Sequence, residues 1–264
     1  MVSHCRFSEH TKLKGLEIGS THKTNNCGDI EILDIIDSRN VLVRFKRTNT
    51  EMFADSRLIR KGIFRDKKQS YSNCGAVLDK VVKYNGVVTK QASVWMSMID
   101  RCYSDRVHIR RPRYKGCIVS DYFMIYSNFE EWCNEQVGFN SLDDFGRTFE
   151  LDKDLLNKGN KIYSENTCVF IPQEINKSLE RANSARGEYP IGVCFDKSRN
   201  KYKSKIKKFG KTVNLGRYDT VIEAFSAYKK AKESYLKELA NKWKSQIDER
   251  AYLALMNYEV HIDD

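Results

Sequence analysis

The sequence predicts an α+β protein that is built from several small units. Three patterns support this fold class. Residues 16–62 contain short runs in which apolar and polar side chains alternate, which is typical of strands. Residues 149–179 show a strand, a polar loop, a second strand and the start of a helix. Residues 191–240 show three strand-like runs followed by a long amphipathic helix.

The N-terminal part, residues 1–68, is predicted to be a small β-rich domain. The runs GDIEILDII and NVLVRFKRT are joined by a turn cluster at 37–40, and MFADSRLIRKGIF would complete a small β-barrel or a curled sheet. Residues 65–70 are a candidate linker. Such a unit could bind DNA, RNA or protein, and nothing in its residues chooses among them.

The next part, residues 87–182, begins with an amphipathic pattern that predicts a helix, VVTKQASVWMSMIDRCY. A basic segment follows, which we interpret as a loop that contacts phosphates, with an ordinary solvated connection as the alternative. Its cations are Arg106, Arg110, Arg111, Arg113 and Lys115. Aromatic residues then recur at helical spacing up to Trp132. This stripe predicts the core side of a second helix, and a base-stacking platform is the less favoured alternative.

Residues 149–179 combine acidic and amide side chains at the joints of a strand, loop, strand and helix. The first strand would end near Asp152, the second would cover 167–171, and the helix would begin at about Gln173. One carboxylate and one amide can hold a single Mg²⁺ beside a scissile phosphate. This segment is therefore the candidate catalytic site.

The third predicted part, residues 187–242, contains lysines at every second position from Lys201 to Lys207. Because a strand sends successive side chains to opposite faces, these lysines would form one cationic face. Thr220 and Glu223 have the spacing of a capping box at the start of the helix. A three-stranded sheet covered by one helix would leave the lysine face open to a polyanion. A solvated surface strand is the alternative.

The last part, residues 243–264, is predicted to be a helical tail. Its stretch QIDERAYLALMNYEV is amphipathic. The tail would pack back on the body or form a dimer seam, and we favour packing back. The sequence gives no indication of the oligomeric state.

Composition limits the partner classes. The chain of 264 residues has a formal net charge of +11 and is 41% hydrophobic, which favours a polyanionic partner and allows real cores. It lacks an apolar run of about 20 residues and a secretory signal, so we expect no membrane span and a cytoplasmic location. The eight cysteines form no Cys-x-x-Cys pair. We interpret them as reduced thiols, with a zinc site as the alternative.

The C-terminal part resembles a known DNA-binding family. The motifs GV-x-F, K-Y-x-S-x-I, L-G-x-Y-x-T and E-A-x-x-A-Y are similar to the APETALA-type domain of plant ethylene-response factors, which is also found on phage endonucleases. The resemblance covers about residues 188–240 and implies that the open sheet face binds in the DNA major groove. The residues that it implicates, with two cations of the preceding turn, are Lys197, Arg199, Lys203, Lys205, Lys207, Thr212 and Asn214, and Cys194 matches as well. The family's base-reading arginines and tryptophan are largely absent, so we expect modest sequence preference.

Residues 95–179 resemble the HNH homing endonucleases of phages. The shared motifs include W-x-x-M-x-x-R-C, F-x-x-W, L-D-K-D and G-N-x-x-Y-S. The resemblance implies that Asp152 and Asn176 are Mg²⁺ ligands and that Asn166 ties the loop together. Lys153 stands where the family carries its general-base histidine. Because an ordinary lysine is a poor base at neutral pH, either Lys153 is perturbed or Asp154 acts instead.

Two functional hypotheses follow from these resemblances. The first is a double-stranded DNA-binding protein of the phage HNH type that cleaves or nicks DNA with Mg²⁺. The second is a catalytically inactive DNA-binding regulator, or an anti-defence or host-takeover protein, that uses the same basic surfaces. A module that mimics or blocks a host protein complex is a third, less favoured hypothesis.

Overall fold

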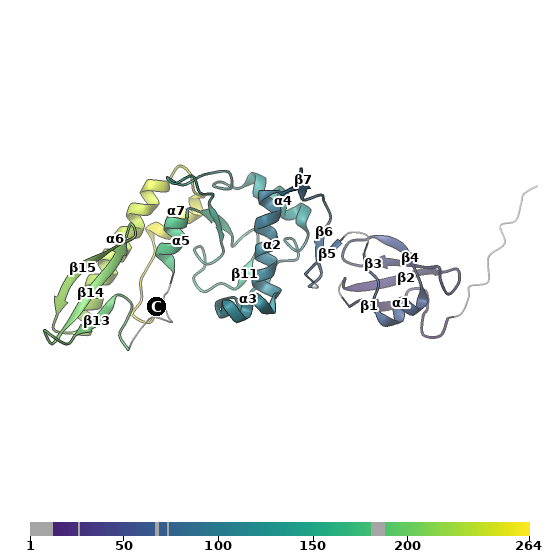
Figure 1. Ribbon diagram of the computed structural model, residues 1–264, viewed down its shortest axis with the longest axis horizontal. Coiled ribbons are helices and arrows are strands. Elements are labelled where there is room, and N and C mark those ends of the chain that lie inside the picture. Colours follow the sequence, from purple (N-terminus) through teal and green to yellow (C-terminus); the bar gives the residue numbers. More distant parts are fainter. Residues whose placement is uncertain (1–12, 26, 67–68, 73, 181–187) are drawn as a thin grey trace, which may run out of the picture. The chain divides into compact units, whose positions relative to one another are not determined.

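The computed structural model describes residues 13–25, 27–66, 69–72, 74–180 and 188–264. The α+β fold class is confirmed, since helices and antiparallel sheets occur along the whole described chain (Figure 1). The chain divides into two compact units, Met1–Glu131 and Trp132–Asp264. The predicted domain limits at 68, 182 and 187 lie outside the described residues, and the four-part division stays a prediction.

A four-stranded antiparallel meander opens the first unit, with the order β1-β2-β3-β4 followed by helix α1. Alternate residues of the two central strands, among them Ile30, Ile32 and Val43, are fully buried, so the predicted period of two is confirmed. Within the described residues β4 does not pair with β1, so the unit is a sheet and not a closed barrel. The elements are β1 (Thr21–Lys23), β2 (Asp29–Ile35), β3 (Val41–Phe45), β4 (Glu51–Ala54) and α1 (Ser56–Lys61).

The candidate linker at 65–70 is not a free connection where it is described. Asp66 is buried and accepts a hydrogen bond from the hydroxyl of Thr48, and a strand begins at Gln69; residues 67 and 68 lie outside the described part. Two hairpins that the sequence analysis did not predict fill the following stretch. They are β5 (Gln69–Tyr71) with β6 (Ala76–Leu78), and β7 (Lys83–Tyr84) with β8 (Val87–Val88).

The two predicted amphipathic helices are present as α2 (Lys90–Tyr103) and α4 (Tyr126–Glu135). In α2 the hydroxyl of Thr89 caps the first turn by accepting from the Ala92 amide at 3.2 Å. Tyr126, Phe129 and Trp132 of the aromatic stripe lie on α4 and are buried, so their interpretation as helix core is confirmed, whereas Tyr122 precedes the helix and is exposed.

The basic segment between these helices is helical, and its prediction as a loop is wrong. It forms α3 (Asp105–Arg110), the 3₁₀ helix η1 (Pro112–Tyr114) and then β9 (Ile118–Val119). The carbonyl oxygen of Ser104 accepts the first helical hydrogen bonds, and Asp105 places a negative charge in the first turn, where the helix dipole favours it.

The predicted strand, loop, strand and helix of the second unit are confirmed. β10 (Glu150–Asp152) pairs antiparallel with β12 (Val169–Ile171), and α5 (Gln173–Leu179) follows after Pro172. The connection contains the short strand β11 (Ile162–Tyr163).

The C-terminal sheet is also built as predicted, with the antiparallel order β13-β14-β15 (Figure 1). Helix α6 packs on one face of the sheet, and the capping box between Thr220 and Glu223 is present at its start. The side chains of Ser204 and Ile206 are buried on the helix side. The elements are β13 (Val193–Asp196), β14 (Lys201–Lys208), β15 (Lys211–Tyr218) and α6 (Val221–Trp243).

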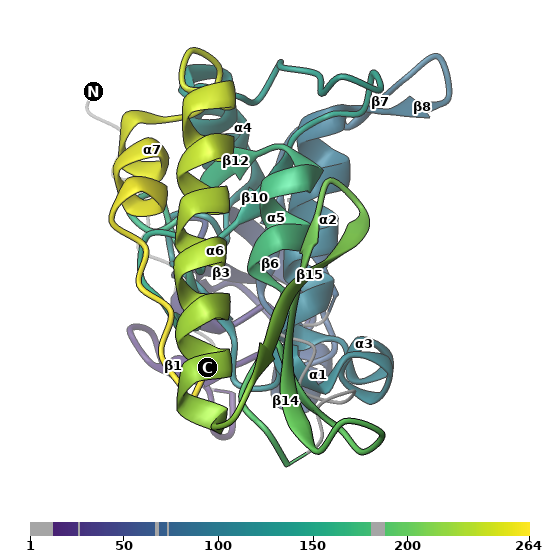
Figure 2. The ribbon, with the colours of Figure 1, turned by 90° about the vertical axis from the view of Figure 1, so that its left-hand side faces the viewer.

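The tail packs back on the second unit, as favoured from its amphipathic pattern. Its helix α7 (Glu249–Met256) lies beside α6 and buries Ala251 and Leu255 (Figure 2). The end of the tail after α7 is held by α6 as well, because Lys229 Nζ donates to the Val260 carbonyl oxygen at 2.8 Å.

Candidate nucleic-acid interface

The open face of the C-terminal sheet carries three lysines in a row, Lys203, Lys205 and Lys207, which we call the lysine row. The residues between them on β14, Ser204 and Ile206, are buried on the other face. The alternation of side chains along the strand therefore places the ammonium groups on one face and the core residues on the other. Lys205 and Lys207 are exposed, and Lys203 is half-buried. Strand register places Asn214 opposite Lys205 and Thr212 opposite Lys207, so both of these predicted contact residues belong to the same face.

Within the described part of the chain, the lysine row forms no ion pair. Two cations of the same strand are neutralised. Lys201, which the sequence pattern also places on this face, lies 2.8 Å from a carboxylate oxygen of Asp219. Lys208 pairs with Glu238 at 3.2 Å. The lysine row therefore keeps its positive charge for a partner, as do the exposed Lys197, Arg199 and Lys211, which form no ion pair with a described residue either.

The turn between β13 and β14 presents two further predicted contact residues, Lys197 and Arg199, both of which are exposed. Asp196 organises this turn. Hydrogen bonds from Arg217 and Ser198 lower the pKa of Asp196 to about 2, so its carboxylate stays ionised and held in place.

The first unit has a separate basic surface on α3 and η1. The side chains of Arg110, Arg111, Arg113 and Lys115 are exposed there, together with that of Arg106. These cations are exposed but project from a helical segment and not from the predicted loop, and their contact with phosphates stays a prediction.

In the second unit, Asp152 ends β10 and is half-buried. Its Oδ1 accepts hydrogen bonds from the backbone amides of Asp154 at 2.9 Å and Leu155 at 2.7 Å. Burial raises the pKa of Asp152 in spite of these hydrogen bonds. The carboxylate is thus fixed in orientation by the start of the loop.

Lys153, the candidate general base, is buried, and its ammonium group is hydrogen-bonded within the loop. Its Nζ donates to Asp154 Oδ1 at 2.6 Å and to the carbonyl oxygen of Asn160 at 2.5 Å. Nζ also lies 5.7 Å from the centre of the Tyr163 ring. An amine that donates in this way presents hydrogens to its neighbours and offers no lone pair to a water molecule. Asp154, the alternative base, is the acceptor in this pair.

The loop is tied together by Asn160. Its amide nitrogen donates to the carbonyl oxygens of Lys153 at 2.9 Å and Ile162 at 2.7 Å, while its Oδ1 accepts from the Ile162 amide at 3.0 Å. Asn166, which the resemblance implicates in this role, is exposed, and its backbone carbonyl accepts from Arg250 at 3.4 Å.

Asn176, the second predicted metal ligand, lies next to a carboxylate that the sequence analysis missed. Its amide nitrogen donates to Glu150, and Gln173 Nε2 donates to the other oxygen of the same carboxylate at 3.1 Å. Glu150 lies two residues before Asp152 on β10, so both carboxylates start from the same face of the strand. The spacing of two residues between Glu150 and Asp152 on a predicted strand could have indicated that both carboxylates lie on one face.

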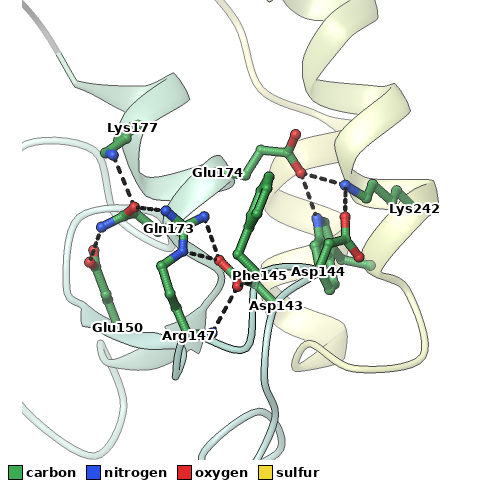
Figure 3. A network of polar contacts seen from close by, with 10 residues as sticks. Asp143, Asp144, Phe145, Arg147, Glu150, Gln173, Glu174, Lys177 and Lys242 are labelled. Atoms are coloured by element: carbon green, nitrogen blue, oxygen red, sulfur yellow. Dashed lines mark hydrogen bonds and ion pairs between the residues drawn. The ribbon is translucent and has the colours of Figure 1, made fainter. Parts of the chain in front are cut away.

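Figure 3 shows the polar network that surrounds Glu150. Arg147 joins Asp143 to Gln173, since its Nε lies 2.7 Å from Asp143 Oδ2 and its Nη1 lies 2.6 Å from Gln173 Oε1. On the other side of the network, the carboxylate of Glu174 accepts from Lys242 at 2.8 Å and from the Trp243 indole at 3.1 Å. These contacts fasten the end of α6 to α5.

The predicted Mg²⁺ ligands are of a suitable chemical type. Asp152 supplies a carboxylate, and Asn176 donates through Nδ2, which leaves its amide oxygen free of that hydrogen bond. Within the described residues there is no group of three or more His, Cys, Asp or Glu side chains that could hold a metal ion. Seven of the described cysteines are free thiols, namely Cys27, Cys74, Cys102, Cys117, Cys133, Cys168 and Cys194.

Comparisons with protein-family models, curated proteins and solved structures found no match to this chain. The two family resemblances therefore remain interpretations of the motifs. Among the described residues, the structure contains no helix with the length and apolarity that a membrane crossing requires.

Proposed function

We propose that this protein binds double-stranded DNA through the open face of its C-terminal sheet. The observation that carries this proposal is the lysine row, three ammonium groups on one face of a helix-backed sheet that form no ion pair with another described residue. A row of unpaired cations attracts phosphates and releases the counterions of DNA when it binds. The hydroxyl of Thr212 and the amide of Asn214 lie beside the lysines and offer additional polar contacts.

The proposed binding favours affinity over sequence discrimination. Lysine is a point charge that suits phosphates, whereas bidentate recognition of guanine is best made by arginine. The one arginine of this face that pairs across from the row, Arg217, is held by Asp196 at 2.8 Å. We therefore expect modest differences in affinity among duplex sequences. If the chain is phage-encoded, as the motifs suggest, it acts in the cytoplasm of the bacterial host.

The test replaces Lys203, Lys205 and Lys207 together with alanine and measures duplex affinity as a function of salt concentration. Loss of three phosphate contacts is expected to flatten the log–log salt slope by about 2 to 3. A matched control replaces three exposed lysines at the outer side and end of α6, Lys230, Lys237 and Lys244.

The control variant loses the same net charge from the same unit. If both variants change the slope equally, binding depends on overall charge and the lysine row is not a specific site. An unchanged slope in the row variant would refute the proposal.

Magnesium-dependent cleavage or nicking of the bound DNA is a second candidate function. It is favoured by the ββα arrangement of β10, β12 and α5, in which Asp152 lies on the first strand and Asn176 on the helix. When bound there, Mg²⁺ would offset negative charge on the leaving oxygen. In this arrangement, however, the Lys153 ammonium donates hydrogen bonds to Asp154 and to the Asn160 carbonyl oxygen and is not available as a base.

A supercoiled plasmid assay with Mg²⁺ or Mn²⁺ tests the second candidate. If the native chain converts the supercoiled plasmid to nicked or linear DNA and Asp152→Ala does not, the result supports cleavage. If neither protein converts the plasmid at concentrations where gel shifts show complete binding, the function that remains is DNA binding without catalysis.

A further inference from the structure

Helix α3 exposes an isoleucine in the most basic segment of the first unit. Ile109 is 80% exposed. The surrounding residues 106–120 contain five Arg or Lys residues and no Asp or Glu. A single exposed apolar side chain is ordinary on a protein surface, so its meaning depends on the residues around it.

The segment is a fixed platform. The ring nitrogen Nε2 of His108 lies 2.9 Å from the Arg101 carbonyl oxygen. The ring of Tyr114 lies near two guanidinium groups, with centroid distances of 5.7 Å for Arg101 and 5.2 Å for Arg113. Through Arg101 of α2, the half-buried His108 and Tyr114 tie α3 and η1 to that helix. The remaining side chains project outward from an ordered backbone.

Ile109 shares its face of α3 with cations. Residues three and four apart lie side by side on a helix, so Arg106 lies beside both Ile109 and Arg110, and the exposed Asp105 also lies beside Ile109. Within the described residues, Arg106, Arg110, Arg111 and Lys115 make no ion pair. The exposed surface is therefore an apolar tip with several cations without an ion pair around it and one carboxylate, Asp105, at its N-terminal edge.

This combination fits duplex DNA better than an apolar protein surface. A protein groove that accepted Ile109 would also have to take up the surrounding guanidinium groups and pair their charges. The minor groove supplies phosphates on both sides and base steps between which an apolar side chain can insert.

We propose that α3 and η1 form a second DNA contact, in which Ile109 inserts between base pairs from the minor groove while the arginines bind the flanking phosphates. This inference rests on the proposed DNA-binding function and adds a contact on the other unit. Insertion would unstack the base step and bend the duplex.

The experiment uses the full chain and short duplexes that carry 2-aminopurine at successive positions, with fluorescent end labels that report bending by energy transfer. The native chain is expected to raise 2-aminopurine fluorescence and to bend the duplex. Ile109→Ala should lose most of both signals and weaken binding by a few fold, with the salt slope unchanged because no charge is removed. Ile222→Ala, in which an isoleucine that is 71% exposed on α6 is removed, is the matched control and should behave like the native chain.

A second variant tests the phosphate contacts. Replacing Arg106, Arg110 and Arg111 with alanine should flatten the salt slope by about 2 to 3, in addition to the effect of the lysine row. If the lysine-row variant changes the slope while Ile109→Ala and the arginine variant change nothing, this inference is wrong and the proposed function stands.

Two further outcomes would overturn the inference. If the native chain binds no duplex, the proposed function and this inference fail together. If Ile109→Ala reduces binding to vesicles that contain phosphatidylserine and leaves every DNA signal intact, the surface belongs to a membrane contact.

Discussion

Replacing Lys232 with methionine is expected to stabilise the protein at neutral pH. Lys232 lies on α6, and its amine donates to the carbonyl oxygen of Ser178 near the end of α5. Burial lowers the pKa of Lys232 to about 8. The folded protein therefore holds this proton less tightly than the unfolded chain does.

The size and sign of the effect follow from this pKa. A decrease from the usual 10.5 to about 8 corresponds to a cost of about 3 kcal/mol for the charged amine. Below pH 8 the amine of Lys232 is charged in both states and the full cost is present. Between pH 8 and 10.5 the folded state loses the proton first, so the free energy of unfolding rises with pH. Methionine removes this cost but leaves the Ser178 carbonyl without its donor, and the lost hydrogen bond offsets about 1 kcal/mol of the gain in stability. The expected net gain at pH 7 is about 2 kcal/mol.

Urea denaturation at about pH 7 and about pH 9.5 measures both consequences. The native chain should gain stability at the higher pH relative to Lys232→Met. Glu180 and Asp264 line the same small cavity, so any attraction between them and the Lys232 ammonium is part of the measured difference. Lys230→Met, an exposed lysine of the same helix, is the control and should keep the native pH dependence. If Lys232→Met is less stable than this control at pH 7, or has the native pH dependence, the argument from burial is refuted.

Four further substitutions test the C-terminal sheet and its helix by thermal or urea unfolding. Gly192→Ala should cost about 2 to 4 kcal/mol because the new methyl would lie 2.0 Å from the Tyr228 ring, whereas Gly210→Ala, at a similar positive φ but in open space, should cost about 1 kcal/mol. Thr220→Ala removes the hydroxyl of the capping box and should cost about 1 kcal/mol. Asp196 has a pKa of about 2, so its stabilising interactions are present above about pH 4 and are lost as pH falls toward 2. Asp196→Asn should therefore flatten the acid side of the stability profile, and an unchanged profile would contradict this.

The sequence predicted the C-terminal sheet most completely because its signals are local. Alternation along β14, the turn residues on either side and the Thr220–Glu223 spacing each depend on residues close in the chain. The strands of the first hairpins, such as β7 and β8, were missed because two-residue strands leave too short a pattern to detect.

The site was harder to predict because its contacts join distant residues. Asp152 and Asn176 were placed on the expected elements, but the partner of Asn176 proved to be Glu150, which is 26 residues away in sequence. Likewise, sequence spacing could show that Lys201 belongs to the alternating row but not that Asp219 neutralises it. Ion pairs of this kind depend on tertiary register, which the pattern of one strand does not contain.

The position of Lys153 separates the two candidate functions physically. A histidine there could use one ring nitrogen for a hydrogen bond that orients the ring and the other to accept a proton. The lysine ammonium instead donates to both Asp154 and the Asn160 carbonyl oxygen and so holds the loop together. Freeing that amine for catalysis would break both contacts and leave a buried amine without partners. The lysine row has no such conflict, because its ammonium groups stabilise nothing in the described fold and are available to a partner. Binding can therefore persist in variants of the loop that abolish any chemistry, and the loss of one function need not weaken the other.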